Sequence, residues 1–421
     1  MFCLTLKIKL RIKPCAYIKN IISIFLIRTN YLLISPYNIF LNITLSILSY
    51  FVQKNKKQVL LGSENGFKFF GNTKYFYLFL LNNKNYFERI FWITANKRIY
   101  INLKRRKLPV LYLYSLSGFI AILRSNYLIT SHFINDVSYF FFLPGRFNKI
   151  ETFHGNAIKK ILQPVNEKGT LICTIGEYLI KKERRSYKLL LTPSEETNKL
   201  FYGHYKNVKV LGYPRNDVFF DQRLIFEDYK AKFNLKKYVK VILYAPTYRD
   251  KPTLKNPFTY NFLTLLNNYL RENNYLFLIK SHYWESSNMT IKNYSNILDV
   301  SESVGDVQDL LINIDVLITD YSSVVLDFIL LNRPIIFYIY DLKEYVETCR
   351  NLNYDYDNNS IIPGPFVKDE NDLFDYIKSI NVIFTNKEYI EKYEKCKKHF
   401  NFYTDGKSCN RLLDYLIKSL D

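Results

Sequence analysis

The sequence predicts an α/β protein with two Rossmann-like, doubly wound domains that face each other across a cleft. Short runs of β-branched and aromatic residues alternate with helical segments from residue 58 onward, which is typical of parallel sheets covered by helices. A charged connecting stretch at residues 217–237 interrupts this alternation, and the pattern then restarts. With 421 residues, the chain is long enough for both domains.

The first element is a segment at residues 1–57, basic and apolar, which we expect to associate with a membrane. Residues 31–52 carry no charge and are numerous enough to cross a bilayer, but Pro36 and several Asn and Ser residues argue against a spanning helix. We therefore expect a helical segment lying in the membrane interface, with a transmembrane anchor and a helix packed on the protein as alternatives. The basic residues near its start are Lys7, Lys9, Arg11, Lys13 and Lys19.

The first predicted domain covers residues 58–220 and the second covers residues 238–421. The strands expected in the first domain are residues 59–62, 90–94, 110–114, 127–130, 150–153, 189–192 and 208–211. Those expected in the second are residues 239–244, 275–279, 297–300, 316–319 and 335–338. From about residue 371, the sequence predicts helices that close the second domain.

Composition limits the possible partners. The net charge of +21 indicates that the protein binds a polyanionic partner. This partner can be nucleic acid, an anionic membrane or a phosphate-rich substrate. The six cysteines are scattered without CxxC spacing, so we expect reduced thiols rather than a disulfide framework or a zinc site.

The stretch VLITDYSSVVLDFILLNRPIIFY (316–338) reads as strand, tight loop, helix and strand. Asp320 follows the first strand, and Ser322 or Ser323 is a natural cap for the helix. Ser323 and Asp327 are four residues apart, so they share one side of it. Ligands of open parallel sheets bind beyond the carboxyl ends of the strands, and a helix start there attracts anions. The alternative is that the serines only cap and Asp320 only makes a turn.

Polar side chains also follow the other predicted strands. His154 precedes a glycine at a strand end, where an imidazole that titrates near neutral pH can act as a general base, although a lone histidine is more often structural. In YAPTYRD (244–250), Thr247 and Arg249 follow a strand; the planar guanidinium suits phosphate oxygens, and a salt bridge to Asp250 is the alternative. Lys280 and His282 end the next strand, where they can flank a diphosphate.

Seven motifs occur in the order and spacing of one known family. They are HGNAIKK (154–160), GYPRND (212–217), YAPTYRD (244–250), KSH (280–282), TDYSSVVLDF (319–328), PGP (363–365) and DGKS (405–408). Residues 55–415 thereby resemble the CDP-glycerol glycerophosphotransferases of teichoic-acid and capsule synthesis. The resemblance implies a GT-B enzyme, peripheral or monotopic on the cytoplasmic face of the cell membrane. Such an enzyme transfers glycerol phosphate, or a related alditol phosphate, from its CDP derivative to a hydroxyl of a lipid-linked or polymeric acceptor and releases CMP.

The resemblance also implies roles for individual residues. His154 resembles the base that deprotonates the acceptor hydroxyl, and His282 is the second catalytic candidate. The remaining residues are expected to bind substrate: Lys159, Arg215, Thr247, Arg249, Lys280, Asp320, Ser322, Ser323 and Asp327. No metal or cofactor is expected, because cationic side chains would stabilise the leaving CMP. Tyr283 stands where the family usually has proline, which affects the details of donor or acceptor binding.

Two other functions compete with this interpretation. A GT-B glycosyltransferase would use a nucleotide sugar, so its donor distinguishes it from a CDP-glycerol glycerophosphotransferase. A nucleic-acid-binding protein would carry basic residues interleaved with exposed aromatics on one face. The basic runs at residues 104–107 and 181–185 lie apart from the seven motifs, so we expect no nucleic-acid partner. The expected partners are a CDP-alditol, a glycan acceptor and an anionic membrane surface.

Overall fold

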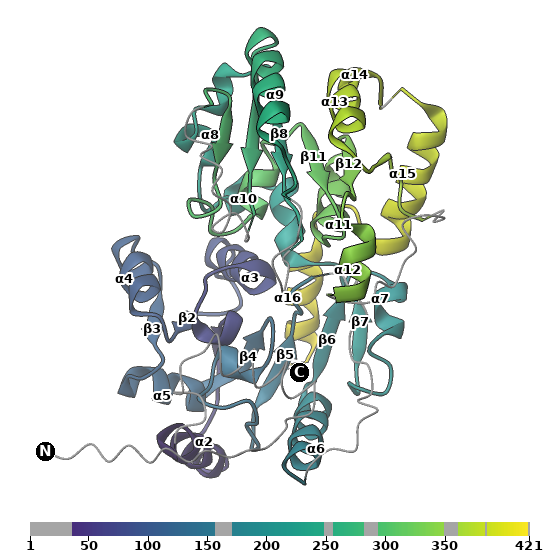
Figure 1. Cartoon of the computed structure of the whole chain (residues 1–421). Coiled ribbons are helices and arrows are strands. Elements are labelled where there is room, and N and C mark those ends of the chain that lie inside the picture. Colours follow the sequence, from purple (N-terminus) through teal and green to yellow (C-terminus); the bar gives the residue numbers. More distant parts are fainter. Residues whose placement is uncertain are drawn as a thin grey trace, which may run out of the picture.

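The computed structural model describes residues 36–155, 171–247, 256–281, 294–348, 361–383 and 385–419. These residues form two α/β domains, each built on a parallel sheet (Figure 1). The expected pair of Rossmann-like domains is thus confirmed.

The first sheet has seven parallel strands in the order β3-β2-β1-β4-β5-β6-β7. All seven predicted strands are present: β1 (Asn55–Leu61), β2 (Arg89–Thr94), β3 (Val110–Tyr112), β4 (Ser125–Thr130), β5 (Asn148–Glu151), β6 (Leu189–Thr192) and β7 (Val208–Val210). Every residue of β4 and β6 is buried, because helices cover both faces of the sheet. The order reverses between β1 and β4, and a doubly wound sheet binds its ligands at that point.

Helices and turns connect these strands. The α-helices are α3 (Gly71–Asn82), α4 (Lys97–Arg105), α5 (Leu116–Arg124), α6 (Leu171–Ser186) and α7 (Glu195–Lys199). The 3₁₀ turns are η2 (Glu64–Gly66), η3 (Ile134–Asp136), η4 (Pro214–Phe219) and η5 (Gln222–Leu224). Several helix starts are fixed by side chains: Asn96 accepts from the first turn of α4, Ser115 from α5 and Ser194 from α7.

The second sheet repeats the same order, β10-β9-β8-β11-β12-β13, again all parallel. Its strands are β8 (Lys240–Tyr244), β9 (Tyr275–Ile279), β10 (Ile297–Asp299), β11 (Val316–Thr319), β12 (Ile335–Tyr338) and β13 (Phe366–Val367). The first five were predicted. The sixth, β13, has only two residues, too few to form a sequence pattern. The order reverses between β8 and β11.

The second domain and the connection to it contain short helices around this sheet. The α-helices are α8 (Tyr229–Lys232), α9 (Tyr260–Glu272), α10 (Gln308–Leu311), α11 (Val324–Phe328), α12 (Leu342–Thr348), α13 (Glu370–Lys378), α14 (Ile380–Ile383) and α15 (Lys387–Phe400). The 3₁₀ turns are η6 (Leu235–Lys237) and η9 (Ile329–Leu331). The helix expected after Ser323 is thus divided into α11 and η9, and it ends where Asn332 adopts φ 54°. Ser323 is the N-cap residue, but its side chain makes no capping hydrogen bond.

The last helix, α16 (Ser408–Lys418), packs against the first domain, although we expected the helices after residue 371 to close the second. Cys409, Leu412 and Leu416 are fully buried in the core of the first domain. The carboxylate of Asp217 accepts hydrogen bonds from two N–H groups at the start of α16. Figure 1 shows α16, in yellow, beside the strands of the first domain. By contrast, α13 and α15 contribute to the core of the second domain.

Helix α2 (Pro36–Leu48) lies on the first domain in contact with α5. Its buried side consists of Leu45 and the polar residues Asn38, Asn42 and Ser46. For these residues, the structure agrees with the alternative of a helix packed on the protein. In the part of the chain that the structure describes, no helix has the length and apolar character needed to cross a membrane.

Candidate active site

The candidate site lies where the carboxyl ends of the two sheets approach each other. His154 and Gly155 follow β5 of the first domain, and Ser323 follows β11 of the second. A Cβ atom on Gly155 would lie 3.6 Å from Ser323 Oγ and 3.2 Å from Arg215 Nη2. Gly155 also adopts φ 155°, a conformation that residues with a side chain rarely adopt, so glycine is favoured where the loop after β5 meets the second domain.

The loop that carries His154 is held by its neighbours. Phe153 adopts φ 54°, a left-handed conformation that is strained for a residue with a side chain. Asn72, near the start of α3, donates from Nδ2 to the carbonyls of Thr152 at 2.9 Å and of Phe153 at 2.8 Å. The hydroxyl of Tyr213 donates to the carbonyl of Gly155 at 3.0 Å. Together these bonds fix the unusual backbone before the histidine.

Arg215 connects this loop to the second domain. Its Nη1 donates to the carbonyl oxygen of His154 at 2.6 Å, and its Nη2 lies 2.6 Å from Asp327 Oδ2. The two side chains are 10% and 4% exposed, so this is a buried ion pair between the domains. Both residues were predicted to bind substrate; the structure brings them together with the His154 loop. Arg215 Nε and Asp327 Oδ1 have no partner among the described residues.

The His154 ring is exposed to solvent but flanked by protein on several sides. It stacks on the ring of His132, with centroids 4.2 Å apart and planes 5° from parallel, and it also contacts Phe153. The surrounding protein, and then the charges of His132 and Arg215, hold the pKa of His154 well below its usual value, while a hydrogen bond with the backbone of Ser131 opposes this shift. His154 is therefore unprotonated at neutral pH, as a general base must be.

Asp320, which is expected to bind substrate, holds a neighbouring loop. Its side chain is fully buried, and Oδ1 accepts a hydrogen bond from the backbone N–H of Thr247 at 2.7 Å. Next to it, the hydroxyl of Thr319 donates to the carbonyl of Ala245 at 2.7 Å. These bonds join the loop after β8 to the loop after β11, at the point where the strand order of the second sheet reverses.

Lys280 follows β9 and lies in the charged surroundings of both domains. Its Nζ donates to the carbonyl of Val304 at 3.1 Å. Burial lowers the pKa of Lys280, with Asp306 opposing the shift and Lys68 of the first domain adding to it.

A buried ionic cluster close to Lys280 also joins the domains. Lys74 Nζ, in α3, lies 2.7 Å from Asp309 Oδ2 and 3.4 Å from Asp306 Oδ2. The Tyr75 hydroxyl donates to Asp309 Oδ1 at 2.9 Å, and the N–H of Gly71 donates to Asp306 Oδ2 at 2.9 Å. All of these groups are buried, so the cluster holds α3 against the second domain.

His132, Asn72 and Lys74 belong to none of the seven motifs. His132 and Asn72 hold the loop of the candidate base, and Lys74 joins the domains. Each is an isolated polar residue in the sequence, and only the fold brings it to this place. Three residues that the sequence did select, Lys159, Arg249 and His282, lie outside the described residues.

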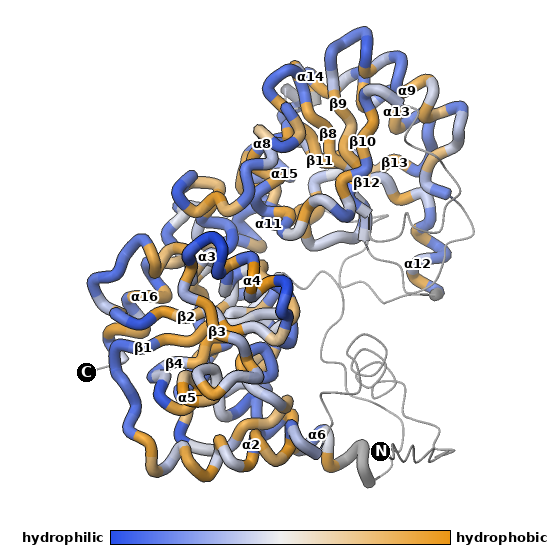
Figure 2. Tube along the Cα trace, turned by 90° about the vertical axis from the view of Figure 1, so that its left-hand side faces the viewer, coloured by the Kyte–Doolittle hydropathy of each residue, from blue (hydrophilic) through white to orange (hydrophobic). Residues whose placement is uncertain are grey.

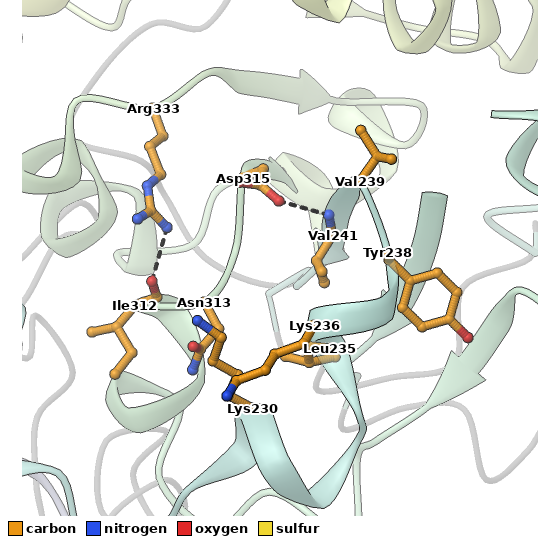
Figure 3. A pocket seen from close by; sticks show the side chains of 10 residues that line it. All are labelled: Lys230, Leu235, Lys236, Tyr238, Val239, Val241, Ile312, Asn313, Asp315 and Arg333. Atoms are coloured by element: carbon orange, nitrogen blue, oxygen red, sulfur yellow. Dashed lines mark hydrogen bonds between the residues drawn. The ribbon is translucent and has the colours of Figure 1, made fainter. Parts of the chain in front are cut away.

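A cavity of about 350 Å³ lies elsewhere in the second domain (Figure 3). Asp315 Oδ2 accepts there from the N–H of Val241 at 2.7 Å, and Arg333 Nη1 donates to the carbonyl of Ile312 at 3.0 Å. Asp315 precedes β11 and Val241 is near the start of β8, so the cavity is at the amino ends of the strands. Ligands of open parallel sheets bind at the opposite edge.

Comparisons with known proteins agree with this geometry. The sequence model of the family "CDP-Glycerol:Poly(glycerophosphate) glycerophosphotransferase" matches residues 44–418. A teichoic acid glycerol-phosphate transferase of Staphylococcus aureus is 29% identical over 376 residues, which cover 86% of this chain and 94% of the relative. A teichoic acid glycerol-phosphate primase of Bacillus subtilis is 32% identical over 312 residues, which cover 70% of this chain and 76% of the relative.

A solved structure shows the same fold. The wall teichoic acid polymerase TagF superposes with a TM-score of 0.73 at 23% identity, over 96% of this chain and 97% of that one. The agreement extends over both domains and confirms the expected GT-B-like arrangement.

Proposed function

Since the chain belongs to the CDP-glycerol:poly(glycerophosphate) glycerophosphotransferase family and is thus a glycerophosphate transferase of teichoic-acid synthesis, we propose that its acceptor is a hydroxyl group on a lipid-linked or polymeric chain. The donor is CDP-glycerol, and CMP is released. A TagF structure with CDPG supports this choice of donor. The observation that carries the proposal is the exposed imidazole of His154 at the junction of the two domains, where the surrounding protein and neighbouring charges hold its pKa well below the usual value.

His154 takes the proton from the acceptor hydroxyl. The hydroxyl oxygen then forms a bond to the phosphorus that carries glycerol, and the bond from that phosphorus to the CMP oxygen breaks. The electron pair of the broken bond leaves with CMP. An unprotonated imidazole near the reacting oxygen is typically worth about 10²–10⁴ in rate.

The charge that develops on CMP is stabilised by residues of the second domain. Lys280, Ser322 and Ser323 follow β9 and β11, and both serines are partly exposed. Lys159, Arg249 and His282 remain proposed contacts. In this mechanism, cationic side chains and hydroxyl donors take the place of a metal ion.

The assay is the release of CMP from CDP-glycerol by the purified protein with a membrane-derived acceptor, alongside calorimetric titration with CDP. We expect His154→Ala to reduce turnover by about 10²–10⁴ and to keep CDP affinity nearly unchanged, because donor contacts lie mainly in the second domain. His204→Ala, a half-buried histidine in the first domain away from the site, is the matched control. Full turnover by His154→Ala would refute the assignment of the base.

We also propose that the first domain docks on an anionic membrane through α2, α5 and α6. Figures 1 and 2 show these helices at the end of the first domain that points away from the second. The outward side of α2 and the turn after it is apolar, and α5 and α6 add further exposed apolar side chains. The residues are Tyr37, Phe40, Ile43, Ile47, Tyr50, Phe51, Leu116, Ile120, Ile175 and Tyr178.

Basic residues surround this apolar surface. Arg124 and Arg146 are exposed, and Lys182 Nζ lies 6.0 Å from the ring of Phe142, whose carbonyl accepts from Asn42 of α2. Apolar side chains within a positively charged rim fit the interface of an anionic bilayer. The placement agrees with the expected peripheral attachment at the cytoplasmic face, where a nucleotide donor is available.

Co-sedimentation with vesicles tests this surface. We expect Phe40→Asp with Phe51→Asp to abolish binding to vesicles that contain phosphatidylglycerol, whereas Tyr260→Asp, at an equally exposed aromatic in α9, should bind normally. Binding of the wild type should weaken as salt rises. Equal binding by both variants would show that another segment provides the attachment.

A further inference from the structure

We propose that His132 is a positioning residue for His154: its ring packs against the catalytic imidazole and holds it in place, so close that a positive charge on one ring opposes a positive charge on the other. The proposal rests on the role of His154 as the base. It assigns a function to a residue that none of the seven motifs contains.

His132 occupies the ligand-binding position of the first sheet. It follows β4, and its partner Glu64 follows β1; the strand order reverses between these two strands. Because β4 pairs directly with β5, the loops that carry His132 and His154 emerge side by side. The fold thus places both residues at the carboxyl edge of the first sheet, where ligands of such sheets bind.

The two rings are stacked rather than joined by a hydrogen bond. Their centroids are 4.2 Å apart and their planes differ by 5°, so the nitrogen atoms of one ring do not point at those of the other. A proton cannot pass directly between rings in this arrangement. The contact therefore acts through packing and through charge.

His132 is held from several directions. Its Nε2 lies 3.2 Å from Glu64 Oε2, its Nδ1 lies 2.9 Å from Ser131 Oγ, and its backbone N–H donates to Asp136 Oδ2 at 2.8 Å. The hydroxyl of Ser131 also lies 3.3 Å from Asp136 Oδ2. Both ring nitrogens of His132 therefore have a partner: Nε2 faces the carboxylate of Glu64, and Nδ1 faces the hydroxyl of Ser131.

Charged groups of opposite sign lie beside the two rings. The carboxylates of Glu64 and Asp136 lie at His132, and Lys68 lies 3.7 Å from Glu64 Oε1 on its other side. Arg215 lies at His154 instead. Glu151, at the end of β5, holds its own proton because burial raises its pKa to about 8.

Two positive charges on rings at this distance would repel each other, and the carboxylates lie beside His132 rather than His154. Burial and then the charge of His132 lower the pKa of His154, in agreement with this distribution. His154 is thereby left free to accept the proton of the acceptor hydroxyl.

The pH dependence of kcat/KM tests the proposal. His132→Phe keeps an aromatic ring for stacking but removes the charge, so the pKa of His154 rises. Activity requires unprotonated His154. The acidic limb of the kcat/KM profile of this variant should therefore move to higher pH by about one unit or more. The kcat on the alkaline plateau should stay within a few-fold of wild type, and CDP affinity should be unchanged. His204→Phe is the control and should leave the profile in place.

His132→Lys separates the two roles, since it restores a positive charge without a ring. Its acidic limb should stay near that of the wild type, while its plateau kcat falls because the His154 ring loses its support. The proposal would be overturned if the acidic limb does not move in His132→Phe. It would also be overturned if the limb moves as far in His132→Lys as it does in His132→Phe. Failure of the base assignment is distinguished by His154→Ala: if that variant remains active, His154 is not the base.

Discussion

Removing one partner of the Arg215–Asp327 pair should destabilise the protein more than removing both. The two side chains are 10% and 4% exposed and their charged atoms are 2.6 Å apart, so each depends on the other for compensation. Breaking a buried pair typically costs about 3–5 kcal/mol, against about 0–1 kcal/mol for a surface pair. We expect Asp327→Asn and Arg215→Met each to lower stability by about 3 kcal/mol or more. The double variant should lose less than either, because no buried charge remains unpaired.

Activity should follow a different order. Asp327→Asn retains the hydrogen bond from Arg215 Nη1 to the carbonyl of His154, whereas Arg215→Met removes it. A charge-assisted hydrogen bond contributes about 1.5–3 kcal/mol, or roughly 10–150-fold in kcat/KM if it is lost from the transition state. The double variant should therefore be as inactive as Arg215→Met while being more stable than it.

Thermal melting and CMP release from the four proteins of this cycle test both orders. Each single variant and the double variant are compared with the wild type under the same buffer and salt conditions. Additive stability losses would refute the buried pair. Equal activity losses in Asp327→Asn and Arg215→Met would refute the separate role of the bond to His154.

Two further predictions concern pH and metal. The pKa of Glu151 is about 8 in the folded protein and 4.5 without burial, so the unfolded chain loses this proton first and stability falls between about pH 4.5 and 8. In Glu151→Gln, the melting temperature should depend less on pH, and the variant should be more stable than the wild type by up to about 5 kcal/mol at pH 8. Parallel curves of melting temperature against pH for the two proteins would contradict this prediction. If side chains stabilise the leaving CMP, EDTA should leave turnover nearly unchanged; a loss that Mg²⁺ restores would contradict the mechanism without a metal.

The strands were predictable because a parallel sheet buried on both faces forces continuous apolar runs into the sequence. The same rule located the polar residues that follow the strands, and so the edge of each sheet that faces the cleft. The rule predicted that His154, Lys280 and the serines after β11 lie at the carboxyl ends of strands, although it uses no information about contacts. The two-residue strand β13 is below the length at which such a pattern exists.

The side-chain contacts of the site residues were less predictable, because contacts between distant parts of the chain leave no local pattern in the sequence. Asp320 was expected near a ligand, yet its buried carboxylate accepts from the backbone N–H of Thr247, a group that every residue except proline offers. Asp327 pairs with Arg215 in the other domain, a contact that depends on how the domains meet. His132 stands alone in the sequence and acquires a neighbour only when β4 pairs with β5.

Helix α2 shows why periodicity does not determine which face of a helix is buried. Its sequence has a polar and an apolar side, and the usual expectation is that the apolar side packs inward. Here, Asn42 Nδ2 donates to the carbonyl of Phe142, and the hydroxyl of Ser49, just after the helix, accepts from the N–H of Arg146. Backbone groups of the first domain thus satisfy part of the polar side, although Asn42 Oδ1 has no partner among the described residues, and the apolar side faces outward. A helix that leaves Phe40 and Ile47 exposed to water gains free energy only when something apolar covers them, and a bilayer supplies such a covering without requiring a specific protein partner.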